Sequence, residues 1–160
     1  MRITVHAVGR MKAGPERELA QRYFDRFSKS GPPVGLEWGG VKETPESRAQ
    51  SAAERKRDEA GRVQAFVNGG ALLILLDERG KTIDSAAFAQ RLAATRDQGC
   101  RDLVLAIGGP DGHDPGLRSS AALVLSFGAL TFPHQLARIL LAEQLYRAST
   151  ILAGHPYHRA

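Results

Sequence analysis

The sequence predicts an α/β domain, built on a mainly parallel sheet with helices on both faces. Two apolar runs, ALLILL at 71–76 and DLVLAI at 102–107, carry this prediction. Strands that are apolar along their whole length are typical of a sheet covered on both sides. Helical segments alternate with the strands, which favours parallel pairing. With 160 residues and no repeat or linker, the chain is expected to form a single domain over 1–160.

The first half of the chain contains two of the expected strands and two of the expected helices. The segment RITVHAV is rich in β-branched residues and predicts a strand, in which His6 is expected to be a structural histidine. Pro15 suits the first turn of a helix, and Thr44-Pro45-Glu46 is a helix-start signal. We therefore expect strands at 2–8 and 34–38, and helices from 14 to about 30 and from 44 to about 68.

The second half contains three further strands, each followed by a loop. The two apolar runs end at Leu76 and Ile107, and a short strand LVLS ends at Ser126. Asp84 or Ser85 is expected to cap the helix that follows the first of these strands. We expect strands at 71–76, 102–107 and 123–126, a polar loop at 77–81, and helices at 84–97, 118–122 and from 133 to about 153.

The loops after these three strands are the candidate ligand site. If the strands are parallel neighbours, residues 76–80, 108–112 and 127–132 meet at one edge of the sheet, where open α/β sheets bind ligands. Glycines at 108, 109 and 112 let the backbone approach a ligand closely. The segment IGGPDG is neither a dinucleotide-binding nor a P-loop motif. A turn without any function would use the same residues, so both interpretations stay open at this point.

The last helix is apolar around most of its circumference. Thr131 or Phe132 is expected to cap it, with Pro133 in its first turn, and Gly154 ends it. A helix that is apolar on all sides must be buried on several sides. In a domain of this size a subunit interface achieves that burial most simply, so we predict a homodimer.

Polar residues on this helix and in the tail behind it are candidates for chemistry. Glu143 and Arg147 are four positions apart, so they predict an ion pair within the helix, while Arg147 or His134 facing the ligand is the alternative. The tail HPYHRA contains two histidines, a tyrosine and an arginine. Such side chains stack on bases, donate to phosphates and move protons. We expect a docked tail that closes the site.

Charge and composition indicate which classes of partner the chain can bind. The formal net charge is +5, from 22 Lys and Arg against 17 Asp and Glu, which suits an RNA partner. The first helix contains four basic residues, Arg17, Arg22, Arg26 and Lys29. They form either a solvated surface or an RNA-facing patch. Lone Cys100 and the absence of zinc-like spacing favour a reducing compartment without a structural metal.

No membrane or export signal is expected. The first residues, MRITVHAVGRMK, lack the apolar core of a signal peptide, and no apolar run approaches the ~20 residues that span a bilayer. We therefore expect a cytoplasmic protein that needs no membrane.

Four segments together resemble one family. The segments IGGPDG at 107–112, LSFGALTFPHQLARILLAEQLYRA at 125–148, HPYHR at 155–159 and LDERGK at 76–81 are similar to the SPOUT-class methyltransferases that act on ring nitrogen 3 of pseudouridine in large-subunit ribosomal RNA. The resemblance covers the whole chain. It is strong from Leu103 onward and weak between Gly31 and Asn68.

The resemblance implies a fold, a cofactor and an assembly. It implies that the carboxyl end of the parallel sheet forms a deep trefoil knot, that the protein is a homodimer, and that the RNA site involves both subunits. It further implies that S-adenosylmethionine binds in the knot on the three loops, and that the tail lies near this cofactor. The implied cofactor contacts are Leu76, Gly108, Gly109, Gly128, Ala129, Leu130, Thr131, Phe132 and Pro133.

The candidate catalytic residues are Tyr157, His158 and Arg159 of the tail, with Arg147 on the last helix. Ring nitrogen 3 loses a proton when it receives the methyl group, so a group must accept or relay that proton. Candidates are His158, Tyr157 and His134, with Arg159 or Arg147 stabilising negative charge on the ring. No metal is required.

Two other functions stay open, and the form of the RNA substrate is also predicted. The chain could be a non-catalytic RNA- or ribosome-binding factor of the same fold, or a nucleotide-binding module with a different ligand. Cofactor binding separates these possibilities. A domain without a separate RNA-recognition module is expected to act on the assembled ribosome, whose shape supplies recognition that a small basic surface does not.

Overall fold

A computed structural model of the chain describes residues 1–158 and has the predicted order of strands and helices. Its five strands form one sheet in the order β2-β1-β4-β3-β5, and every neighbouring pair is parallel. The strands are β1 (Arg2–Val8), β2 (Glu37–Thr44), β3 (Leu72–Thr82), β4 (Asp102–Ile107) and β5 (Leu123–Ser126). The helices are α1 (Pro15–Ser30), α2 (Ala52–Val67), α3 (Ser85–Asp97), α4 (Pro115–Ser120) and α5 (His134–Leu152).

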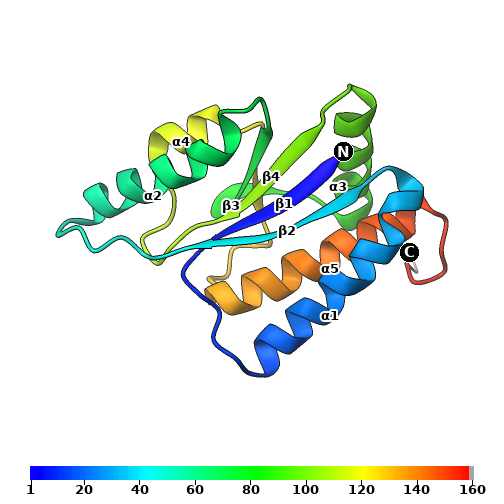
Figure 1. Cartoon of the computed structure of the whole chain (residues 1–160), viewed down its shortest axis with the longest axis horizontal. Helices are drawn as coiled ribbons and strands as arrows, with labels where there is room; N and C mark the ends of the chain where they lie inside the picture. The colour runs from blue at the N-terminus through cyan, green and yellow to red at the C-terminus, as the bar shows by residue number, and fades with distance from the viewer. Residues whose placement is uncertain (159–160) are drawn as a thin grey trace.

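The helices cover both faces of the sheet, as predicted (Figure 1). On one face, α1, α3 and α5 pack over the larger core, in which Phe24, Leu92 and Leu145 are buried. On the other face, α2 and α4 contribute Val63 and Leu117 to a smaller core. Burial on both sides explains why β3 and β4 are apolar along their length. No helix among residues 1–158 is both long enough and apolar enough to cross a membrane.

The second strand starts later than the sequence predicts. Pro32–Val34 form a 3-10 turn, and Gly35 ends it with a φ of 73°, so the strand begins at Glu37 and not at Val34. The strand then continues through Gly39 and Gly40 to Thr44. A register shift against β1 falls at these glycines, where a Cβ on Gly39 would lie 2.4 Å from Thr4 Oγ1. Gly39 and Gly40 therefore form a bulge within a strand that continues beyond the predicted end at Trp38.

The start predicted for the second helix is also wrong. Thr44 is the last residue of β2, and α2 begins only after Ser51. Ser51 and Glu54 form a capping box in which Ser51 Oγ accepts from Glu54 N at 3.2 Å and Glu54 Oε2 accepts from Ser51 N at 3.1 Å. The S-x-x-E spacing was present in the sequence, and it outweighs the Thr-Pro-Glu signal because it satisfies two free backbone N–H groups at once.

Three smaller boundaries differ as well. The predicted loop at 77–81 belongs to β3, although the pairing with β5 shifts register between Leu76 and Lys81. The predicted turn at 118–122 is α4 at Pro115–Ser120, because Asp114 caps it by accepting from Gly116 N and Leu117 N. Neither Thr131 nor Phe132 caps α5, since Pro133 occupies the N-cap position without a side-chain bond.

The last helix is buried largely within its own chain. It packs between α1 and α3 and buries Leu141 and Leu145 completely. Its apolar circumference therefore needs less of a subunit interface than the sequence suggested. Leu136 nevertheless stays 44% exposed, and Leu130 in the preceding loop is 74% exposed. The homodimer and the trefoil knot stay predictions.

His6 is the structural histidine that the sequence predicted. Its side chain is fully buried, its ring lies 5.1 Å from that of Phe66, and Nε2 lies 3.3 Å from Thr44 Oγ1. Burial, followed by the charges of His113 and Arg62, lowers the pKa of His6 from 6.5 to about 4. The folded state therefore favours the neutral imidazole.

We predict that His6 makes the fold sensitive to mild acid. A pKa that is lower in the folded chain than in the unfolded chain contributes stability that is complete above pH 6.5 and lost as the pH falls toward 4. The free energy of unfolding should fall by on the order of 2 kcal/mol across this window. Urea titrations at several pH values would measure it, with His6→Asn as the control that lacks the titrating group. Parallel pH profiles for both proteins would contradict the assignment.

Candidate functional site

The three loops predicted to meet at one edge do meet there. β3 lies between β4 and β5, so their carboxyl ends are adjacent. A cavity of about 370 Å³ lies among the loops. Its lining includes most of the predicted cofactor contacts, namely Leu76, Gly108, Gly109, Gly128, Leu130, Thr131 and Phe132. Ala129 and Pro133 belong to the same loop but do not line the cavity, whereas His134 from the first turn of α5 does.

The loop after β4 has glycines where other side chains fill the space. A Cβ on Gly108 would lie 3.1 Å from the ring of His113. A Cβ on Gly109 would lie 2.7 Å from Glu59 Oε2 and 3.1 Å from Val8. Glu59 is buried, and its Oε1 accepts from Ser47 N at 2.9 Å, so it has little freedom to move away. Glycine is therefore required at 108 and 109, because the space that a Cβ would take is filled by His113, Glu59 and Val8.

His113 connects two of the three loops. Its ring is buried, and Nε2 lies 3.1 Å from the carbonyl oxygen of Leu76 at the end of the apolar part of β3. Burial lowers the pKa of His113 against the opposing effect of the nearby Asp77 carboxylate. A neutral ring that donates from Nε2 fixes the Leu76 carbonyl at the cavity wall.

A single arginine holds the turn at 109–112 against α2. Arg55 Nε and Nη2 donate to the two oxygens of Asp111 at 2.6 and 3.1 Å. Its Nη1 donates to the carbonyl oxygens of Ala49 and Gln50 at 3.1 and 3.0 Å. The hydrogen bonds from Arg55 lower the pKa of Asp111 below its ordinary value. A bidentate pair of this kind fixes orientation as well as distance, so Arg55 sets the position of one wall of the cavity.

The loop after β5 is organised by Ser126 and Glu78. Ser126 Oγ accepts from Gly128 N at 3.1 Å, and Thr131 Oγ1 donates to Glu78 Oε2 at 3.0 Å. Gly128 has a φ of 130°, a conformation that favours glycine. These bonds fix the position of the loop beside the cavity.

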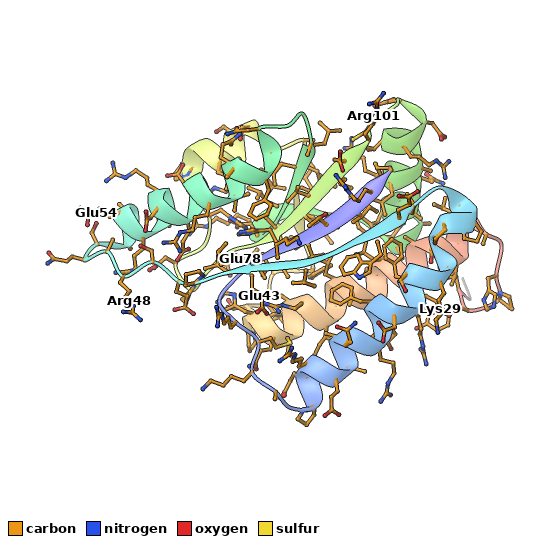
Figure 2. All side chains as sticks on the ribbon, in the orientation of Figure 1. Lys29, Glu43, Arg48, Glu54, Glu78 and Arg101 are labelled. Atoms are coloured by element: carbon orange, nitrogen blue, oxygen red, sulfur yellow. The ribbon has the colours of Figure 1, made fainter. Side chains whose placement is uncertain are left out.

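The beginning of α5 is fastened to the carboxyl ends of β1 and β2. Arg138 is buried and donates to Glu43 on β2 and to the carbonyl oxygen of Gly9 at 3.3 Å. Figure 2 shows Glu43 beside the beginning of α5. Burial alone would raise the pKa of Glu43, but hydrogen bonds from Arg138 and from Met11 N lower it below its ordinary value. The ionised pair fixes the end of α5 that carries His134.

The polar residues at the other end of α5 form a second cluster. Glu143 accepts from Arg147 Nε and Nη2 at 2.8 and 2.6 Å, so the predicted ion pair is confirmed. The hydroxyl of Tyr157 donates to the same oxygen of Glu143 at 3.2 Å. Arg147 also lies 5.1 Å above the ring of Tyr157, and that ring is 4.7 Å from the ring of Tyr146. The tail is therefore docked, as expected.

Tyr157 is held in its protonated form. Burial, followed by the charge of Glu143 and a hydrogen bond with Tyr23, raises the pKa of Tyr157 to about 12. A phenol with this pKa donates a hydrogen bond at neutral pH and does not accept a proton. His158 differs, because within residues 1–158 its buried Nδ1 has no hydrogen-bond partner. Arg159 lies outside the described residues.

The cavity and the second cluster, which contains Arg147 and Tyr157, lie far apart within one chain. Arg147 follows His134 by 13 positions of α5, which corresponds to about 20 Å along the helix. Figure 1 shows the loops of the sheet edge near the beginning of α5 and the tail near its end. The expectation that the tail closes the site therefore does not hold for the cavity of the same chain. Arg147 and Tyr157 come together with each other, but not with the loop residues.

Several residues of the site were not found from the sequence. Arg55 and Asp111 are 56 positions apart, and Arg138 and Glu43 are 95 apart, so no local pattern connects them. His113 was not predicted to be a site residue. Two signals in the sequence were available for this part of the site. They are the acidic residue Asp111 in the turn and the capping box before Arg55. Among residues 1–158, no group of three or more His, Cys, Asp or Glu is arranged to hold a metal ion.

Comparisons with known proteins agree with the segments that carried the resemblance. A family model described as "Predicted SPOUT methyltransferase" matches residues 1–158. Two curated proteins named ribosomal RNA large subunit methyltransferase H, from Brucella anthropi and Mesorhizobium japonicum, are 68% and 67% identical to the chain over 160 residues. Each alignment covers 100% of both sequences.

The solved structures agree at the level of the fold. A probable methylase family protein from Haemophilus influenzae matches with a TM-score of 0.51 at 12% identity, over 99% of this chain and 70% of that one. The shared parallel sheet, the family model over nearly the full length and the highly identical relatives lead to the same result. The chain belongs to the SPOUT methyltransferase family.

Proposed function

We propose that the chain transfers a methyl group from S-adenosylmethionine to ring nitrogen 3 of a pseudouridine in large-subunit ribosomal RNA. The observation that supports this most strongly is the full-length identity of 68% and 67% to proteins named ribosomal RNA large subunit methyltransferase H. The pseudouridine target follows from the similarity of IGGPDG, LSFGALTFPHQLARILLAEQLYRA and HPYHR to that branch of the family.

The cavity fits the cofactor. Its volume of about 370 Å³ is within the range of small-molecule sites. Apolar side chains of Leu76, Ile107 and Leu125 form one part of the wall, and the backbone at 108–109 and 128–132 supplies N–H and C=O groups in another. An apolar wall beside backbone donors and acceptors suits an adenosine group. When bound, S-adenosylmethionine supplies a methyl group already activated on a sulfonium.

Glu143, Arg147 and Tyr157, which we name the tail cluster, supply the interactions with the uracil ring that the cavity does not provide. Arg147 is held by Glu143 through Nε and Nη2, so its Nη1 can donate to negative charge that develops on the uracil ring, while the hydroxyl of Tyr157 donates to Glu143 and helps to orient this pair. Tyr157 therefore acts as a donor and not as the proton acceptor. His158 accepts the proton from ring nitrogen 3, with His134 at the cavity as the alternative, and Arg159 assists Arg147.

The active enzyme is a homodimer. In one chain, Arg147 lies about 15 to 20 Å along α5 from Ala137 and His134, which line the cavity, and this is too far for a methyl group to pass between them. A second copy can bring its Arg147 and Tyr157 to the cavity of the first. The exposed Leu130 and Leu136 lie beside that cavity and are suited to an apolar contact with the other subunit.

The substrate is the assembled ribosome, and the enzyme acts in the cytoplasm. A formal charge of +5 spread over 160 residues provides limited affinity for naked RNA. Recognition of shape by a structured particle supplies the rest.

Transfer of labelled methyl groups tests this function. Ribosomes, separated subunits and free ribosomal RNA from cells that lack the protein would be incubated with labelled S-adenosylmethionine, and the modified nucleotide mapped by mass spectrometry. We expect label on one pseudouridine and the highest rate with assembled ribosomes. Equal methylation of protein-free RNA would contradict the proposed substrate state. Absence of both label and cofactor binding would instead support a non-catalytic RNA-binding factor.

We predict that the Arg55–Asp111 pair controls cofactor affinity. Asp111→Asn removes the charge that holds the turn at 109–112, so the Kd for S-adenosylmethionine should rise about tenfold, equivalent to about 1.4 kcal/mol. Calorimetric titration would measure the change. Asp102→Asn is the matched control, because it breaks a pair with Arg2 at the opposite end of β4. An unchanged Kd in Asp111→Asn, or an equal rise in the control, would sink the prediction.

A further inference from the structure

Arg26 on α1 is held beside the tail cluster by aromatic rings. Its guanidinium carbon lies 5.5 Å from the ring centroid of Tyr23 and 5.7 Å from that of Tyr146. The ring of Tyr146 in turn contacts that of Tyr157, over which Arg147 lies. The residues Tyr23, Arg26, Tyr146, Arg147 and Tyr157 therefore form one continuous surface, which we name the Tyr–Arg surface.

The charge of Arg26 is not neutralised within residues 1–158. Its side chain is exposed and makes no ion pair with a carboxylate of that range. The nearest acidic residue in sequence, Asp25, accepts from Gln21 at 2.7 Å. Arg147 differs, since Glu143 occupies two of its nitrogens. Arg26 thus combines a fixed position with free N–H donors.

The surroundings of Arg26 favour a polyanion. Arg22 precedes it by one helical turn and Lys29 follows it by nearly one turn, so three exposed cations lie along one side of α1. Figure 2 shows Lys29 on α1 with its side chain pointing away from the sheet. A guanidinium that stacks on tyrosine keeps its edge N–H groups available, and that edge matches the geometry of a phosphate.

We propose that Arg26 binds a backbone phosphate of the ribosomal RNA next to the target nucleotide, so that the substrate site extends from the tail onto α1. This rests on the proposed function. The Tyr–Arg surface offers aromatic faces for bases together with donors for phosphates, which is the combination that single-stranded RNA requires. Tyr23 and Tyr146 act as positioning residues, because they hold the guanidinium in place before the RNA arrives.

The test compares Arg26→Ala and Arg26→Lys with wild type in methylation of ribosomes and, separately, in ribosome binding by cosedimentation at several salt concentrations. For Arg26→Ala we expect a rise in KM and Kd for ribosomes of about tenfold, and a salt slope smaller by about one. Arg26→Lys keeps the charge and should keep the slope, but lose part of the affinity because lysine lacks the planar stack. The Kd for S-adenosylmethionine should not change in either variant.

Arg57→Ala is the matched control, because it removes one exposed positive charge from α2 on the opposite face of the sheet. An effect of Arg57→Ala equal to that of Arg26→Ala would overturn the proposal in favour of general electrostatic attraction. A wild-type KM and salt slope in Arg26→Ala would also overturn the proposal. So would a loss of affinity that accompanies a lower Tm, if Arg26→Lys restores both the Tm and the full affinity. A wild-type protein that binds ribosomes but transfers no methyl group would overturn the proposed function, while the binding data would still decide the role of Arg26.

Discussion

Because β3 pairs in parallel with β4 on one side and β5 on the other, three loops leave the sheet at the same edge. The cavity exists only through this pairing, since residues near 76, 108 and 130 are otherwise far apart in the chain. The contacts around it then fix each wall. His113 binds the Leu76 carbonyl, and Arg55 holds the turn that contains Asp111.

The length of α5 is the second constraint. A helix of 19 residues anchored at one end by Arg138 and Glu43 carries its other polar residues well away from the cavity. In the proposed dimer, the same helix therefore contributes to two half-sites, one at each end. The arrangement gives a physical reason for a dimer in which each subunit completes the site of the other. It also accounts for the Glu143–Arg147–Tyr157 network, which orders the tail before any partner is bound.

Much of the fold was predictable from the sequence, because local rules agree with the global structure for the apolar strands and for the order of the elements. The boundaries failed where two signals competed, as at Thr44 and Ser51, or where a strand continued through a glycine bulge at Gly39. The glycine loops were predictable because backbone approach needs glycine. The partners of Arg55 and Arg138 were not, since ion pairs across dozens of residues leave no periodic trace. The separation of tail and cavity likewise required coordinates.

Complementation between two defective subunits tests the composite site most directly. One subunit would carry Gly109→Val, selected for loss of cofactor binding with the assembly intact, and the other Arg147→Ala, which leaves the cavity unchanged. Each variant alone should be inactive. In a random mixture of equal amounts, mixed dimers would contain one intact cavity facing one intact tail, and methylation should return to about a quarter of the wild-type rate. A mixture that forms mixed dimers and remains inactive would show that cavity and tail act within one chain, and would contradict the composite site.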